Sequence, residues 1–259
     1  FLNQLKKETT YSINLNNCIK DVNEGNILKN LNYTFSTSDK IDTLEINGKL
    51  IDAKTLEPII NTWVFLQNEN LQDSLCFQTR PLYVTKSNEN GDFTFNNLNK
   101  KDYQLFTISG LDFIYHEGDR LGFINRLVNA INDSNLTIRL FDPSYEHEVN
   151  NIKDSLLQND SILVGDITIT SNLDVNIILQ LFQDKELKKE VSFKKSPYII
   201  KNIKAGEYDI YLTIDDNKNN LWDTGNFILQ QLPEKIYRYK ETLKIRADWN
   251  LEINWPVNE

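Results

Sequence analysis

Hydrophobic and polar residues alternate in short runs along most of the chain, and Asn, Asp and Gly separate the runs. Residues 33–37 and 44–50 alternate, residues 62–66 form a denser apolar run, and Asn90-Gly91 is a hairpin signal. Similar runs recur toward the C-terminus, at residues 166–170, 175–181, 243–247 and 249–255. Successive side chains of a strand point to opposite faces, so this pattern predicts many short strands packed as β-sandwiches.

Two stretches depart from the alternating pattern. The first has apolar residues every three to four positions and predicts a short helix: Leu121, Ile124, Leu127, Val128 and Ile131. The second, residues 146–157, is polar and is either a short helix or a linker. We therefore expect an all-β chain of tandem sandwich modules with at most one or two short helices.

One segment occurs twice in the chain. Residues 95–105 and 200–210 share the order apolar, polar, Asn, apolar, turn, polar, Tyr, polar, apolar. The pattern predicts a strand, a tight turn and a second strand, in which the Asn ends the first strand and the Tyr points into the sandwich. The two copies therefore indicate two related modules.

Composition and charge exclude several partners. The 259 residues are 40% hydrophobic and 25% charged, which suffices for ordinary cores, and the net charge is -9. Nucleic-acid binding and electrostatic docking to anionic lipid both need basic surface, so neither is expected. No apolar run is long enough to span a bilayer, and no leader sequence is visible. Cys18 and Cys76 are two buried thiols or a bridged pair.

An Asn-rich segment near the C-terminus is the sharpest candidate metal site, while Glu146-His147-Glu148 is better explained as a solvated linker. Oxygen-bearing side chains stand at the alternating spacing of a calcium loop, at Asp215, Asn217, Asn219 and Asp223. The carbonyl of Leu221 is a further candidate ligand. Asn220 replaces the usual turn glycine, and Asn226 stands where a Glu would close the loop. The alternative is a turn that joins two strands without an ion.

Tryptophans are the candidate binding residues. Exposed Trp222 and Trp249 would suit a glycan or protein surface, whereas Trp and Tyr side chains also fill sandwich cores. The chain has two histidines and none of the short motifs of metalloproteases, serine hydrolases or phosphate-binding loops. We therefore expect a protein that is not an enzyme.

Several motifs together resemble known families. Residues 48–58, 63–66 and 90–103 resemble a carboxypeptidase-regulatory-like, transthyretin-like β-sandwich, which carries no peptidase residues. Residues 9–37 resemble the last strands of a bacterial Ig-like domain. Three C-terminal stretches resemble the last module of the same proteins, at residues 215–225, 231–235 and 246–249. In this order the motifs resemble the Ig-like domain-containing lipoproteins of Bacteroidota-type outer membranes.

The resemblance implies a domain plan. Residues 1–39 would be the C-terminal part of an Ig-like domain, 40–141 a carboxypeptidase-regulatory-like sandwich, 142–160 a linker and 161–259 a C-terminal sandwich.

It also implies a location in the outer membrane, through an N-terminal lipid on a Cys that is not in this sequence. The expected function is a structural or interaction subunit of a larger assembly, such as a β-barrel assembly or export machinery. Its partners would be outer-membrane β-barrel proteins or other lipoproteins. The alternative is a calcium-assisted carbohydrate-binding surface protein.

Overall fold

The computed structural model describes residues 4–15, 19–28, 31–70, 78–110, 112–146 and 163–257. Every regular element in these ranges is a β-strand, which confirms the expected all-β fold of several small sheets. No helix in the described ranges is long and apolar enough to cross a membrane. Cys18, Cys76 and most of the second helical candidate lie outside the described residues.

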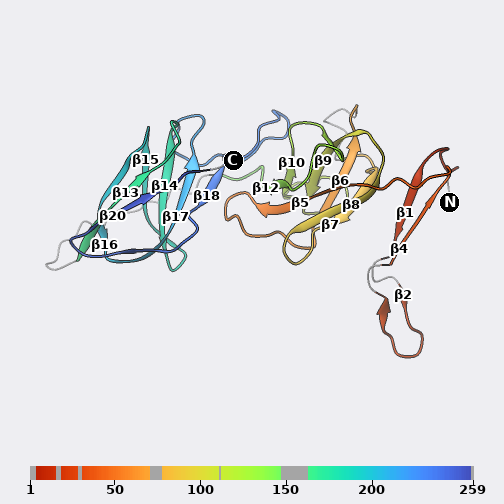
Figure 1. Ribbon diagram of the computed structural model, residues 1–259, viewed down its shortest axis with the longest axis horizontal. Coiled ribbons are helices and arrows are strands. Elements are labelled where there is room, and N and C mark those ends of the chain that lie inside the picture. Colours follow the sequence, from red (N-terminus) through yellow and green to blue (C-terminus); the bar gives the residue numbers. More distant parts are fainter. Residues whose placement is uncertain are drawn as a thin grey trace. The chain divides into compact units, whose positions relative to one another are not determined.

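The N-terminal strands form two small ribbons. β1 (Thr10–Asn14) pairs antiparallel with β4 (Asn32–Ser36), and β2 (Ile19–Lys20) pairs with β3 (Ile27–Leu28) (Figure 1). The rings of Tyr11 and Phe35 stack with centroids 5.4 Å apart on the first ribbon.

The first sandwich consists of a five-stranded and a three-stranded sheet. The larger has the order β10 (Leu121–Phe123), β9 (Asp102–Ile108), β6 (Trp63–Asn68), β7 (Tyr83–Lys86), with β11 (Val128–Asn129) also on β9. The smaller has the order β12 (Leu136–Leu140), β5 (Leu44–Asp52), β8 (Asp92–Leu98). Their inner faces bury one apolar core, which includes Ile46, Leu50, Val64, Leu66, Phe93, Phe95, Leu105 and Ile138.

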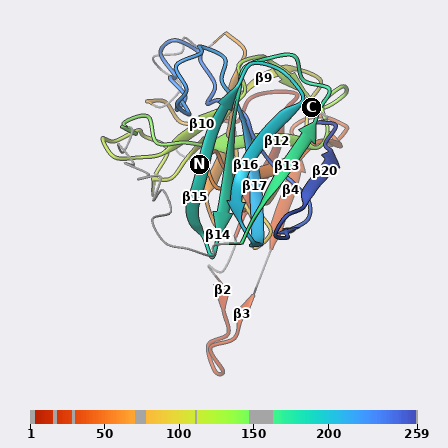
Figure 2. The ribbon, with the colours of Figure 1, turned by 90° about the vertical axis from the view of Figure 1, so that its left-hand side faces the viewer.

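The second sandwich has the same construction (Figure 2). Its larger sheet has the order β15 (Glu186–Phe193), β14 (Ile177–Gln183), β17 (Gly206–Ile214), β18 (Ile236–Arg238), with β19 (Leu243–Ile245) on β17. Its smaller sheet has the order β16 (Tyr198–Lys204), β13 (Val164–Thr170), β20 (Asn250–Asn254). The core includes Ile167, Ile169, Leu179, Leu181, Ile200, Ile210, Leu212 and Trp255.

The two sandwiches share one strand order, including an unusual parallel pair at the end. The last strand of each module runs parallel to the first, β12 beside β5 and β20 beside β13, while the other pairs are antiparallel. The repeated segment is β8, a turn and β9 in one module and β16, a turn and β17 in the other, and in both modules the turn carries the chain from the smaller sheet to the larger one. Asn97 and Asn202 both have a positive φ, of 60° and 57°, and Tyr103 and Tyr208 are both buried. The predicted repeat is therefore confirmed as the same strand-turn-strand unit.

The helix predicted over residues 121–131 is wrong. Leu121–Phe123 form β10 against β9, and Val128–Asn129 form β11 against the start of β9. Leu127 and Ile131 are 43% and 54% exposed, so the periodic residues do not share a buried face. The spacing arose from two short strands whose inward positions happen to fall at helical intervals.

By spatial contacts the described chain forms two compact units. The first comprises residues 1–52 and 57–140, and the second residues 53–56 and 141–259.

Candidate functional site

The loop that follows β17 carries the four predicted metal ligands. Asp215 comes directly after the strand, and its own N–H donates to the Asn176 carbonyl at 3.0 Å. Its side chain is 2% exposed, and the carboxylate oxygens accept the N–H groups of Asn219 and Asn220, each at 3.1 Å. Asn220 adopts a φ of 63°, which Asn tolerates better than most residues. The chain therefore curls around a buried carboxylate.

The side-chain amides of Asn217 and Asn219 connect the middle of this loop to Asp223 at its far end. Their Nδ2 groups donate to one oxygen of Asp223, Oδ2, at 2.6 Å and 2.7 Å. Their Oδ1 atoms accept backbone N–H groups two residues ahead, from Asn219 at 3.0 Å and Leu221 at 2.8 Å. The structure thus brings all four predicted residues together, in a loop held by its own side-chain turns.

The ligand set for a metal is incomplete as these side chains stand. The oxygens of Asn217 and Asn219 accept backbone N–H groups, and both amide nitrogens are directed at Asp223 Oδ2. In the described ranges, no group of three or more His, Cys, Asp or Glu side chains could hold a metal ion. The arrangement fits a self-contained turn, and calcium binding stays a prediction.

Glu234 belongs to this cluster and was missed by the sequence analysis. Its carboxylate accepts the N–H groups of Asp216 at 2.8 Å and Asp223 at 3.1 Å. Its backbone carbonyl accepts the indole N–H of Trp222 at 2.9 Å. Glu234 lies eleven positions beyond Asp223, outside the spacing of a continuous calcium loop, so no local pattern marks it.

Burial makes Glu234 an unusual acid. The side chain is 4% exposed, and desolvation raises its pKa to about 7, although the two backbone N–H donors act in the opposite direction. The negative charges of Asp223 and Asp215 raise the pKa further. The Glu234 carboxyl is therefore partly protonated near neutral pH.

Asn226, the residue at the position of a closing Glu, does not reach the loop. It pairs with Gln231 across a turn, and its Oδ1 accepts the N–H of Leu229 at 3.1 Å. Asp223 and Glu234 close the base of this second turn, since the Glu234 N–H donates to the Asp223 carbonyl at 3.0 Å. We call residues 224–233 the apolar loop.

The tip of the apolar loop presents hydrophobic side chains to solvent. Ile228 is 89% exposed and Leu229 is 70% exposed, and neighbouring Leu232 is 37% exposed. The loop contains no charged residue over its ten positions. These two adjacent aliphatic side chains form an exposed apolar tip, and contiguous exposed apolar surface marks candidate contact sites.

The two predicted binding tryptophans lie at opposite ends of the second sandwich. Trp222 is half-buried beside the Asp215 loop and packs edge-on against Tyr145, with ring centroids 5.3 Å apart. Trp249 is 63% exposed, and its carbonyl accepts the N–H of Asp166 near the β16–β17 turn. Asp215 lies at the other end of β17, about 30 Å away at roughly 3.3 Å per residue. The two rings therefore form no common platform.

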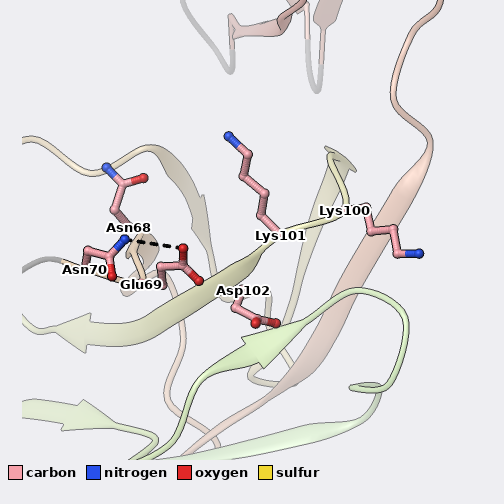
Figure 3. A pocket seen from close by; sticks show the side chains of 6 residues that line it. All are labelled: Asn68, Glu69, Asn70, Lys100, Lys101 and Asp102. Carbon is pink, nitrogen blue, oxygen red and sulfur yellow. Dashed lines mark hydrogen bonds between the residues drawn. The ribbon is translucent and has the colours of Figure 1, made fainter.

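A shallow polar cleft lies at one end of the first sandwich (Figure 3). It is lined by Asn68, Glu69, Asn70, Lys100, Lys101 and Asp102, from the end of β6 and the β8–β9 turn. Asn70 Nδ2 donates to Glu69 Oε1 at 3.3 Å, and the side chains of Lys100 and Lys101 extend away from each other (Figure 3). Its mixed charges suggest no particular chemistry.

Comparisons with known proteins assign no family. No family model matches the chain, and no curated protein matches it. Among solved structures, it is similar to the Bacillus anthracis TIE protein, with 10% identity and a TM-score of 0.23, over 89% of this chain and 36% of that one. The minor pilin GBS52 of Streptococcus agalactiae gives 11% identity and a TM-score of 0.24, over 83% and 95%. A streptococcal ancillary pilin gives 10% and 0.22, over 98% and 76%. At these scores the likeness carries no argument about function.

Proposed function

We propose that this chain is a non-catalytic interaction protein that binds another protein through the apolar loop of its second sandwich. The observation that carries the proposal is the exposure of Ile228 and Leu229, at 89% and 70%. Covering two aliphatic side chains of this size stabilises a complex by about 1.5–3 kcal/mol each before the costs of association. The partner is expected to present an apolar pocket that receives these two side chains.

The base of the apolar loop supports this proposal. Asp223 and Glu234 hydrogen-bond to each other on one side of it, and Asn226 pairs with Gln231 within it. These hydrogen bonds restrain the loop before binding, which lowers the entropy that a complex loses.

The proposal extends to a setting. The motif order that resembles outer-membrane lipoproteins favours an accessory subunit of an outer-membrane assembly, with integral β-barrel proteins or other lipoproteins as partners. In this setting the chain is lipid-anchored, and the tandem sandwiches are spacers that position the apolar loop.

The test is a pair of substitutions with a matched control. Ile228→Asp with Leu229→Asp places two charges on the tip, and the control Ile199→Asp places one charge at a 48% exposed position of β16. After mild detergent extraction of the native protein, an integral outer-membrane barrel protein should co-purify with wild type and the control, and not with the double variant. Recovery of wild type as a free monomer would contradict the proposal.

A second candidate function, calcium-assisted glycan binding, is favoured by the buried carboxylates. Asp215 and Glu234 are 2% and 4% exposed, and the Glu234 carbonyl accepts the indole N–H of the half-buried Trp222. An ion there would order the loop and add a ligand for sugar hydroxyls. A glycan array probed with and without calcium tests this function, and equal, background-level signals in both arms would exclude it.

A further inference from the structure

A groove separates the β1–β4 ribbon from the open side of the first sandwich. Its volume is about 690 Å³, and its walls come from β1 and β4 on one side and from β7, β8 and the start of β9 on the other. Asn97 lies where the walls meet, and its Oδ1 accepts hydrogen bonds from Ser12 at 3.5 Å and Thr34 at 3.4 Å. The Asn97 amide also donates to the Asp42 carbonyl at 2.9 Å. The groove is thus a built feature of this unit.

The lining of the groove has a distinct chemistry. More than half of the described lining residues are Ser, Thr or Asn, whose side chains each offer both a donor and an acceptor. Apolar patches from Tyr11, Tyr83 and Val84 lie among them. Hydroxyls and amides next to aromatic and aliphatic faces match a sugar, which has hydroxyls at its edges and C–H groups on its faces.

The charge of the groove contrasts with that of the chain. Lys6 and Lys101 are its charged lining residues, and the described lining contains no Asp or Glu, although acids outnumber bases 37 to 28 in the chain. An acidic ligand would find complementary charge at the two lysines, while Asp42, whose charge acts on the lining residues Tyr83 and Tyr103, lies outside the lining.

The second sandwich provides an internal comparison, because the strand registers match. Matching Tyr103 with Tyr208 aligns β9 with β17, and through the strand pairings it also aligns β6 with β14 and β7 with β15. In this alignment Lys189 and Glu190 of β15 occupy the positions of Tyr83 and Val84 of β7. The repeat likewise places Lys201 at the position of Asn96. The common fold therefore tolerates charges at these positions, and their absence from the first module is a property of its groove.

We propose that this groove binds an acidic oligosaccharide. The Ser, Thr and Asn side chains accept from and donate to its hydroxyls, Tyr83 covers a C–H face, and Lys6 and Lys101 contact its carboxylates. The site lies in the first unit and uses no residue of the apolar loop or the Asp215 loop.

The test measures binding of the full chain to oligogalacturonates, with malto-oligosaccharides as the neutral probe. Asn96→Ala removes a donor and acceptor at an exposed position, and Lys101→Gln removes a charge. Each should weaken binding of the acidic probe about tenfold, the effect of one charge-assisted or well-placed hydrogen bond. Thr137→Ala, exposed on β12, and Lys201→Gln, exposed on β16, are the matched controls and should change binding less than twofold.

Four results would overturn the proposal. The first two concern wild type: no binding of oligogalacturonates by the folded protein, or an affinity for malto-oligosaccharides equal to that for oligogalacturonates. The other two concern the variants: a loss of affinity in the controls as large as in Asn96→Ala and Lys101→Gln, or an unchanged affinity in Asn96→Ala and Lys101→Gln. Far-UV circular dichroism of each variant separates loss of the site from loss of the fold. Because the apolar loop is untouched, co-purification of the barrel partner should persist in both groove variants, so this inference and the proposed function can fail independently.

Discussion

Glu234 and Asp223 are hydrogen-bonded to each other in both directions. The Asp223 N–H donates to Glu234 Oε2 at 3.1 Å, and the Glu234 N–H donates to the Asp223 carbonyl at 3.0 Å. This pair closes the apolar loop and also links it to the loop that begins at Asp215. One buried carboxyl group therefore connects the two candidate functional features of the second sandwich.

Stability should fall as the pH rises through the range in which Glu234 ionises. Its folded pKa is about 7 against an ordinary 4.5, so between these values the folded state holds a proton that the unfolded state has released. The free energy of unfolding contributed by this group is thus highest below pH 4.5 and declines until about pH 7. The total is at most about 3.5 kcal/mol, at about 1.4 kcal/mol per pKa unit.

Glu234→Gln should remove this decline, because the amide does not ionise. Denaturant unfolding at pH 5 and pH 8 measures the difference, with Glu207→Gln at an exposed position of β17 as the control. A Glu234→Gln variant that keeps the wild-type pH dependence would show that other groups cause it.

Calcium should stabilise the second sandwich if the Asp215 loop binds it. An ion that binds only the folded state at a hundred times its Kd adds about 2.7 kcal/mol. Thermal unfolding with millimolar calcium should then shift upward by several degrees in wild type and not in Asp215→Asn, while magnesium serves as the ion control. An equal rise in unfolding temperature in wild type and in Asp215→Asn would show that calcium binds at another site.

Tyr208→Phe should destabilise the second sandwich by about 0.5–1.5 kcal/mol. The Tyr208 hydroxyl donates to the Lys204 carbonyl at 2.9 Å across the β16–β17 turn, and its ring is buried in the core. Phe keeps the packing and loses the hydrogen bond. Tyr33→Phe, at a 59% exposed ring, should change the free energy of unfolding by less than about 0.5 kcal/mol.

Asn202→Gly should be tolerated, and Asn202→Ala should cost about 1 kcal/mol. The residue has a φ of 57°. At this backbone angle Gly is unstrained, Asn is tolerated because its polar side chain can hydrogen-bond locally, and Ala is strained by its Cβ. The backbone N–H of Asn202, which donates to Asp166 Oδ1 at 3.0 Å, survives both changes. Denaturant titration of the two variants measures the difference, and equal stability would contradict the role assigned to φ.

Local sequence patterns predicted much of the architecture correctly. Alternation between 44 and 50 is β5, and the repeat around Tyr103 and Tyr208 is the same strand-turn-strand unit in both modules. The hairpin signalled by Asn90-Gly91 is wrong, because the strands on either side of this turn, β7 and β8, belong to different sheets. The helix over residues 121–131 failed because two short strands pair separately with β9, and such pairing is not a local property.

The sequence by itself determined the all-β class, the doubled module and the Asn-rich turn after β17, because side-chain periodicity and turn preferences act over a few neighbouring residues. The tertiary structure decided which distant residues share a site. It brought Glu234 to Asp215, placed Trp249 at the far end from Trp222, and exposed Ile228 and Leu229 at a loop tip. These outcomes depend on strand order and register, since hydrogen bonds between strands join positions whose separation along the chain no local pattern encodes.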